Sequence, residues 1–293
     1  MIRIGYVGVN TILPSASKTF RLAGYSDERM IEVTRGNLSA LREILQWNLD
    51  HDITLFRITS QLVPFGSHPV NSGLWQTALK KEFRQVGQFG TAHSMRLTMH
   101  PGQYTVLNTP NETFLTRSIN DLQYHQTVLS MMGLDNSCKI ILHGGGAYGD
   151  RETSLNILRL RVAQLPANIR ARLVLENDER IFNAAEIWET CRQTGIPGVL
   201  DVFHHEILPS LEQVSIRELI IRFGDTWHGQ RQKIHYSDQA PGKNKGAHSE
   251  SVDVTQFGRL YKEIYDLDLD IMIEAKDKQT SVLKLREAYP ELR

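Results

Sequence analysis

The chain has 293 residues, of which 41% are hydrophobic, and its 33 Lys and Arg side chains are balanced by 33 Asp and Glu side chains. This length allows a large core, either in one α/β domain or in two small ones. No linker or low-complexity tract divides the sequence, which favours a single domain that spans residues 1–293. The zero net charge excludes a general electrostatic attraction to nucleic acid or membrane, so such a partner must bind through local patches.

The compartment is predicted from the cysteines and the N-terminus. Cys138 and Cys191 lack metal-ligand spacing and give no disulfide framework, which is typical of a reducing compartment. The first residues enter a strand-like run without the basic and apolar regions of a signal peptide, and no apolar stretch approaches the roughly 20 residues of a membrane span. We expect a soluble, cytoplasmic protein with no membrane contact and no obligate protein partner.

Strand-like and helix-like segments alternate along the chain. Short runs rich in β-branched and apolar residues predict strands at 2–7, 55–59, 96–100, 139–143, 172–176, 198–203, 233–236 and 270–274. Two apolar stripes with helical spacing lie between them, at Leu38, Leu41, Leu45 and Leu49, and at Phe257, Leu260, Tyr261, Ile264 and Tyr265. Ser215 and Glu218 predict a capping box at the start of another helix.

Eight strand-then-helix units, in a chain a little longer than the roughly 250 residues typical of that fold, predict a TIM (β/α)8 barrel. The structural alternative is an open, doubly wound sheet. In a barrel of this kind the catalytic groups come from the C-terminal ends of the strands, where the following loops surround a common mouth.

Ionisable side chains stand at most of these predicted strand ends. They are His100, His143, Glu176, Asp201, His204, His235 and Glu274, with His248 in the loop after the seventh strand. Any one of them alone is more often a hydrogen-bonded structural residue than a ligand. Their shared position at the strand ends instead predicts a site for several divalent cations, and mixed nitrogen and oxygen donors suit Zn²⁺ or Mn²⁺. Because side chains alternate along a strand, we expect His204 to point inward and His205 outward.

Lys233 lies two residues before His235, so both side chains should face the barrel interior. A cationic lysine beside bound metals would be repelled, since nearby positive charge lowers its pKa. We therefore expect Lys233 to be a phosphate contact or a neutralised group, for example a carboxylated one. The alternative is a lysine that forms an ion pair with Glu274 or Asp201.

Metal ions at such a mouth can hydrolyse phosphodiesters, because they activate water and clamp the attacking and leaving oxygens. The glycine-rich segment 228–250 contains the basic residues Arg231, Lys243 and Lys245. They favour phosphodiester hydrolysis as the function, because they could bind the phosphates of a nucleic-acid backbone. The alternative is a solvated charged loop. The first long loop, 10–30, also carries basic residues and could help to form a groove for a duplex.

Gln103 and Tyr104 follow the expected ligand His100 in the segment MHPGQYTVLN. A planar amide and an aromatic ring could wedge into a stack of bases and hold it open. The alternative is a tyrosine that packs against a neighbouring loop.

Seven motifs resemble those of the UV damage endonucleases, in order and over essentially the whole chain: GYVGVN, MHPGQYTVLN, LHGGGAYGDR, LVLENDER, LDVFHH, KIHYSDQ and MIEAKDK. The resemblance implies a TIM barrel similar to that of the endonuclease IV type of apurinic endonuclease. It also implies the activity of the UV damage endonucleases, which nick DNA immediately 5′ of UV photolesions. It implies as well that the seven residues at the strand ends, together with His248, hold up to three metal ions, usually manganese. The same donors also accept zinc or cobalt. Gln103 and Tyr104 resemble the pair that probes the lesion, and Asn10 and His68 are further expected site residues.

From this resemblance we expect hydrolysis just 5′ of pyrimidine dimers, 6-4 photoproducts and also abasic sites, with 3′-hydroxyl and 5′-phosphate products. Glu176, Lys233 and His235 are the expected catalytic residues, and damaged double-stranded DNA is the expected partner. Two other functions compete with this one: a metal-dependent sugar isomerase or epimerase of the same fold, and a metal-binding or DNA-binding protein without enzymatic activity.

Overall fold

The structure is a computed structural model that describes residues 1–211 and 213–293. Eight parallel strands pair in chain order, and the last pairs with the first, so the sheet closes into a barrel and the open doubly wound alternative is wrong. The strands are β1 (Ile2–Gly8), β2 (Leu55–Ile58), β3 (Arg96–Met99), β4 (Ile140–His143), β5 (Leu173–Glu176), β6 (Gly198–Asp201), β7 (Gln232–Tyr236) and β8 (Leu269–Ile273). The predicted TIM barrel is therefore confirmed.

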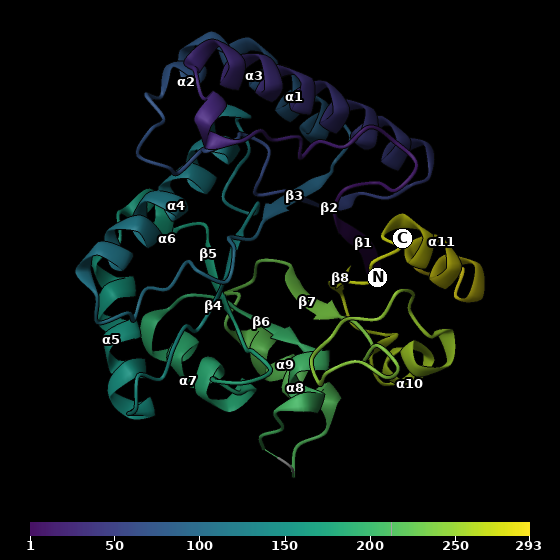
Figure 1. Cartoon of the computed structure of the whole chain (residues 1–293). Coiled ribbons are helices and arrows are strands. Elements are labelled where there is room, and N and C mark those ends of the chain that lie inside the picture. The colour runs from purple at the N-terminus through teal and green to yellow at the C-terminus, as the bar shows by residue number, and fades with distance from the viewer. Residues whose placement is uncertain (212) are drawn as a thin grey trace.

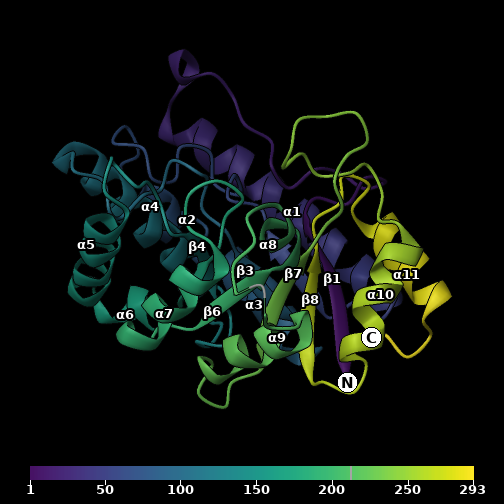
Figure 2. The ribbon, with the colours of Figure 1, turned by 90° about the horizontal axis from the view of Figure 1, so that it is seen from below.

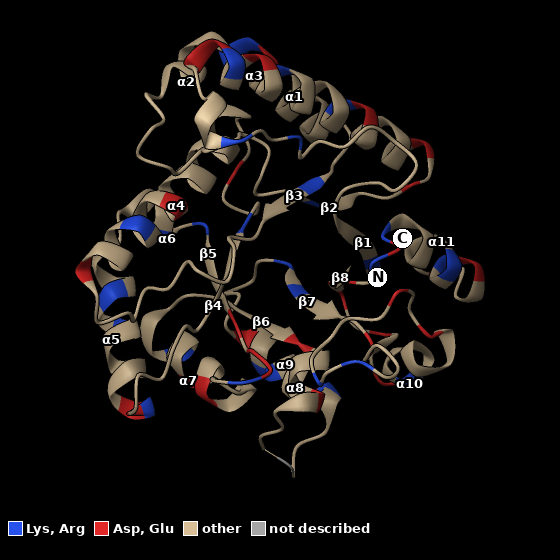
Figure 3. Ribbon diagram, viewed as in Figure 1, with Lys and Arg blue, Asp and Glu red and all other residues tan. Residues whose placement is uncertain are grey.

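The helices surround the strands (Figure 1). They are α1 (Asp27–Asp50), α2 (Leu74–Ala78), α3 (Lys80–Ala92), α4 (Glu112–Met131), α5 (Arg151–Gln164), α6 (Ala167–Arg170), α7 (Ala184–Thr194), α8 (Val202–Ile207), α9 (Ile216–Asp225), α10 (Val254–Ile264) and α11 (Gln279–Ala288), and a 3-10 turn, η1 (Leu22–Gly24), lies in the first loop. Figure 3 shows basic and acidic residues interspersed on the outer helices. No helix among the described residues is long and apolar enough to cross a bilayer.

The apolar stripes predicted from helical spacing face the core except at the end of the second one, where Tyr265 follows α10 and is 66% exposed. Leu38, Leu41 and Leu45 of α1 are buried, as are Phe257 and its neighbours one turn apart in α10. Burying each such side chain contributes about 1.5–3 kcal/mol. The predicted capping box before α9 is only half formed: Ser215 accepts from the Glu218 amide, but the Glu218 carboxylate binds Arg222 instead of returning to Ser215.

The barrel interior is layered, because every second side chain of a strand points inward. At the N-terminal end, Asp270 is fully buried between guanidinium groups. Above it, Lys233 donates to Thr98. A small buried apolar cluster fills the side of the barrel that β4, β5 and β6 form, and it consists of Ile141, Val174, Val199 and Trp227. The ionisable side chains named above occupy the layer at the C-terminal ends, so the strands place them at one mouth.

The ionic layer at the N-terminal end includes Arg231, which the sequence interpretation had assigned to the DNA-binding rim. That position is wrong, because Arg231 precedes β7 and therefore lies at the foot of the barrel, away from the mouth. Its guanidinium donates to Asp270 at 2.6 Å and also pairs with Asp268. Arg3 and Arg96 bind the same Asp270 carboxylate at 2.7 and 2.8 Å.

Both ends of the described chain lie at this foot, side by side (Figure 2). The amide of Arg293 donates to the Ile2 carbonyl at 3.0 Å, and the Ile4 amide donates to the Arg293 carbonyl at 2.6 Å. The long loops that follow β1 and β7 extend from the opposite end (Figure 2).

Candidate metal centre

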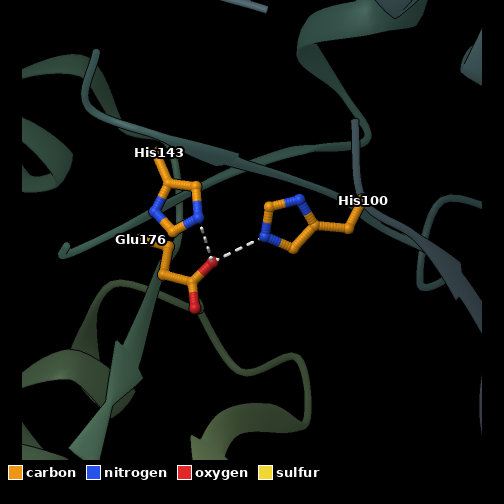
Figure 4. Close-up of side chains that lie close together, drawn as sticks. All are labelled: His100, His143 and Glu176. Carbon is orange, nitrogen blue, oxygen red and sulfur yellow. Dashed lines mark hydrogen bonds and ion pairs between the residues drawn. The ribbon is translucent and has the colours of Figure 1, made fainter. Parts of the chain in front are cut away.

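Glu176, the last residue of β5, is at the centre of the mouth and is 1% exposed. One carboxylate oxygen, Oε2, lies 2.9 Å from Nε2 of His100 and 3.8 Å from Nε2 of His143, and Figure 4 shows both rings pointing at it. The other oxygen, Oε1, lies 2.5 Å from Nδ1 of His235. Glu176 therefore contacts three histidines, one that directly follows β3 and two that belong to β4 and β7.

Two overlapping groups of donor atoms satisfy the spacing that a metal ion requires. In each group the donor atoms lie within 4.8 Å of one another: the first is His100, His143 and Glu176, and the second is Glu176, Asp201, His235 and Glu274. Glu176 belongs to both groups. A carboxylate with two oxygens can bridge neighbouring ions, so the arrangement suits a cluster of ions as well as a single one.

His204 and His248, the other two predicted ligands, lie beside these groups but belong to neither of them. The predicted strand through residue 203 is too long: β6 ends at Asp201, whose side chain caps α8 by accepting from the His204 amide at 2.8 Å. His204 thus reaches the mouth from a helix, where its ring centroid is 5.7 Å from that of His143 and 6.0 Å from that of His248. His205, expected to face outward, lines a pocket between α8, α9 and α10.

Backbone carbonyls fix the orientation of three of these imidazoles. Nδ1 of His100 donates to the Pro101 carbonyl at 2.8 Å, Nδ1 of His204 to that of Asn177 at 3.0 Å, and Nδ1 of His248 to that of Glu274 at 2.9 Å. A carbonyl only accepts, so each Nδ1 carries the proton and each Nε2 is left to bind something else. A hydrogen bond of this kind is the usual second partner of a metal-bound histidine.

These residues fit a divalent cation. Burial lowers the pKa of His100, which makes its Nε2 an acceptor facing the acceptor oxygen of Glu176 at 2.9 Å. Two acceptors at that distance require a proton or a cation between them. In addition, Nδ1 of His143 and Oδ2 of Asp201 are buried without a hydrogen-bond partner among the residues that the structure describes, and buried polar atoms rarely remain so.

The electrostatics of the mouth also favour a cation. Burial, with a further contribution from Glu176, raises the pKa of Asp201 to about 6. Burial opposes a charge on His204, but Asp201, Glu176 and Glu274, with the hydrogen bond to the Asn177 carbonyl, together outweigh it and raise the pKa of His204 to about 9. Burial lowers the pKa of His235 to about 3, although Glu176 opposes this shift. Three acidic side chains and mostly neutral imidazoles therefore crowd one small volume, and a divalent cation would compensate their charge.

Arg57 of β2 is a member of this site that the sequence analysis missed. Its guanidinium donates to Nε2 of His235 at 2.9 Å and forms an ion pair with Glu274. Burial would raise the pKa of Glu274, but Arg57 holds it well below its usual value. The sequence of β2, LFRI, could have predicted this position. Because side chains alternate along a strand, Arg57 points to the inner face and its apolar neighbours point outward.

Lys233 is fully buried below the ligands, where it contacts Thr98 through a 3.3 Å hydrogen bond. The expected alternative of an ion pair with Glu274 or Asp201 is not found among the described residues, whose ion pairs do not include Lys233. Burial and the nearby Arg57 and Arg96 hold the pKa of Lys233 well below its usual value. A phosphate contact of Lys233 would have to form within this buried layer, and it stays a prediction.

Gln103 and Tyr104 lie on an exposed turn that the Thr105 amide closes by donating to the Gly102 carbonyl at 2.9 Å. The Tyr104 side chain is 87% exposed, so it does not pack against a neighbouring loop. With Phe114 and Tyr148, which are also more than half exposed, it borders a pocket of about 630 Å³ beside the mouth.

The remaining predicted DNA contacts differ in exposure. Lys243 and Lys245 are exposed on the loop after β7, and Lys245 also donates to the Ile207 carbonyl at 2.8 Å. His68 is exposed on the loop between β2 and α2. Asn10 is buried and holds the first loop, because it donates to the Tyr6 hydroxyl and accepts from the Ile12 amide, each at 3.1 Å.

Comparison with known proteins decides between the functions that this mouth could serve. The sequence profile of the family described as UV-endonuclease UvdE matches residues 2–293. The chain belongs to this family. As a UvdE endonuclease it is a hydrolase of phosphodiester bonds, which removes the sugar isomerase and the non-enzymatic protein as alternatives.

Relatives of this UvdE endonuclease are similar over nearly all of its length. A UV DNA damage endonuclease from Clostridium perfringens is 36% identical, over 99% of this chain and 71% of its own. Another from Bacillus pumilus is 32% identical, over 99% and 95%. The crystal structure of SacUVDE has a TM-score of 0.94 and 37% identity over 99% of both chains. Endonuclease IV from Thermus thermophilus, with a TM-score of 0.63 and 14% identity over 98% and 99%, shares the fold.

Proposed function

We propose that this UvdE endonuclease is a metal-dependent DNA repair enzyme that cleaves immediately 5′ of UV photolesions and leaves a 3′-hydroxyl and a 5′-phosphate. The observation that carries the proposal is the position of Glu176, which belongs to two overlapping groups of metal ligands at the mouth of the barrel. Its relatives are named UV DNA damage endonucleases, which supports damaged DNA as the substrate. Pyrimidine dimers, 6-4 photoproducts and abasic sites all weaken base stacking, so one site that detects distortion suits them all.

The cofactor proposed is a cluster of up to three divalent ions. The residues that would hold it are His100, His143, Glu176, Asp201, His204, His235, His248 and Glu274. Mixed imidazole and carboxylate donors suit manganese, with zinc and cobalt as alternatives. When bound, such ions supply Lewis acidity that activates water and stabilises the charge developing on the phosphate.

The side chains of the chain itself keep this site ordered. Arg57 contacts both His235 and Glu274 and so fixes two ligands from neighbouring strands. Lys233, buried and close to Arg57 and Arg96, is proposed to act as a neutral group, either as an amine or after carboxylation. A mass increase of one carboxyl group on the peptide that contains Lys233, or continuous density past its Nζ, would identify the carboxylated form.

The mouth and its loops are proposed to bind the duplex. Lys243 and Lys245 extend from the loop after β7 and could contact phosphates, and His68 lies on another exposed loop. Asn10 is proposed to act through the first loop, which it holds in place. Gln103 and Tyr104 would fill the space that displaced nucleotides leave, since an exposed aromatic ring stacks readily on bases.

Replacing Tyr104 by Ala is expected to weaken binding to a lesion-containing duplex about tenfold, because one base–aromatic stack is lost. The melting temperature should not change, since the ring is 87% exposed. Fluorescence anisotropy with a labelled duplex measures the affinity. Tyr265→Ala, which removes another largely exposed tyrosine, is the matched control and should bind as the wild type does. Equal affinities for the two variants would contradict the wedge.

The proposed function is tested by nicking a 5′-labelled duplex that contains one pyrimidine photodimer, with Mn²⁺, Zn²⁺ or Co²⁺. We expect one labelled fragment that ends just 5′ of the dimer, and a DNA polymerase should extend it because its end is a 3′-hydroxyl. The undamaged duplex is the control. Absence of a fragment with every metal, or cleavage that ignores the lesion, would contradict the proposal.

A further inference from the structure

Lys278, the last residue of the motif MIEAKDK, adopts a backbone conformation that lysine rarely takes. Its φ and ψ are 55° and −114°, close to the first central position of a type II′ turn, where glycine is preferred. The turn is closed by the Thr280 amide, which donates to the Asp277 carbonyl at 3.1 Å. A side chain here costs roughly 1–3 kcal/mol of strain, so a glycine would suit the backbone better.

Neighbouring loops hold this turn in place. The amides of Lys276 and Asp277 donate to the carbonyls of Ser249 and Glu250, at 3.2 and 2.8 Å, in the loop that carries the ligand His248. On the other side, Gln279 accepts from the Thr11 amide at 3.0 Å in the first loop. Lys278 is thus fixed between the loops that follow β1 and β7, four residues beyond the ligand Glu274.

The Lys278 side chain has no structural role that would account for the strain. It stands at the N-cap position of α11, but within the described part of the chain its side chain makes no capping hydrogen bond. Among the described residues its ammonium takes part in no ion pair, whereas Arg57 pairs with Glu274 nearby. The side chain is half-buried, and the charged groups near it are the carboxylates of Glu274, Asp277 and Glu250 and the guanidinium of Arg57.

We propose that the Lys278 ammonium binds a phosphate of the cleaved DNA strand, at the scissile position or next to it. A cation without a partner, fixed on the rim of the metal centre, is placed to receive an anion, and a rigid turn limits the entropy lost on binding. The inference rests on the proposed function, because it assumes that the DNA backbone crosses this mouth.

The first test measures binding over a range of salt concentrations, in a Glu176→Gln background so that the photodimer duplex is not cleaved. Lys278→Ala should weaken binding about tenfold or more and reduce the slope of log K against log[salt] by about 0.9. Lys278→Arg should keep the slope. Lys276→Ala, which removes an exposed lysine two residues away, should match the parent. An unchanged slope for Lys278→Ala would overturn the inference, even if affinity fell.

A second measurement separates binding from folding. Lys278→Gly should raise the melting temperature by roughly 2–4 °C, because it relieves the strain, and yet weaken binding as Lys278→Ala does. A glycine variant that melts higher and binds as the parent does would show that the lysine contacts no phosphate.

The contacted phosphate is identified by replacing single phosphates with neutral methylphosphonates. At the contacted position, the duplex should lose affinity for the parent but not for Lys278→Ala, so the two changes are not additive. Strict additivity at the scissile phosphate and at both flanking ones would overturn the inference. Failure of the wild type to nick any lesion duplex would instead remove the proposed function, so the two failures are distinguishable.

Discussion

Replacing Glu176 by Gln is expected to reduce nicking of a photodimer duplex by at least about a thousandfold, because the amide has lost the charge on which both groups of metal ligands depend. The change preserves shape, so circular dichroism should show a folded barrel. Single-turnover nicking with Mn²⁺ measures the effect. Equilibrium dialysis should show fewer bound ions per chain, a result that does not depend on activity.

Glu206→Gln is the matched control for this substitution. Glu206 is on α8, and its side chain lines the outer pocket between α8, α9 and α10 rather than the mouth. The same chemical change there should leave metal content and nicking unaltered. A Glu176→Gln enzyme that retains a tenth or more of wild-type turnover would show that the metal centre does not depend on this carboxylate.

Replacing Asp270 by Asn is expected to lower the free energy of unfolding by about 3–5 kcal/mol, since it leaves Arg3, Arg96 and Arg231 together without their shared counter-charge. Urea denaturation measures the change. Asp268→Asn is the control, because Asp268 pairs with Arg231 at the surface and is 69% exposed. An exposed pair contributes at most about 1 kcal/mol, so similar losses for the two variants would contradict the role of burial.

The same carboxylate makes stability depend on pH in the acid range. Burial would raise the pKa of Asp270, but Arg3 and the other guanidinium groups hold it below its usual value. The folded state therefore binds this proton less readily than the unfolded chain, whose aspartates have pKa values of about 3.9. The stabilisation is present above that pH and is lost as the pH falls through the lower, folded pKa. Urea midpoints between about pH 5 and 2 should fall less steeply for Asp270→Asn than for the wild type.

The period of the hydrophobic pattern was enough to predict the barrel and to place ionisable side chains from different strands at one mouth. In a parallel barrel the C-terminal ends of all eight strands lie at the same mouth. Residues as far apart in the sequence as His100 and Glu274 could therefore be placed together without knowledge of any contact. His204 reached the predicted mouth by a route that the pattern did not predict, because the Asp201 side chain ends the strand and starts a helix.

Other features depend on three-dimensional context that a sequence pattern does not contain. Arg231 is an exception: the strand predicted at 233–236 already placed it before β7, and its assignment to the rim overlooked this order. Arg57 was missed because an arginine inside an apolar strand becomes meaningful only when a carboxylate faces it, as Glu274 does. The positive φ of Lys278 was unpredictable from a residue type that normally avoids that conformation.

The two chain ends meet at the foot of the barrel, where Arg293 hydrogen-bonds to the first strand. A linker or label attached to either end therefore leaves from the side opposite the loops that would face a substrate (Figure 2). A molecule tethered by an end to a bead or glass surface would present its mouth to the solution. Single molecules could then be watched as they search along a stretched duplex, with the anchor clear of the path of the DNA.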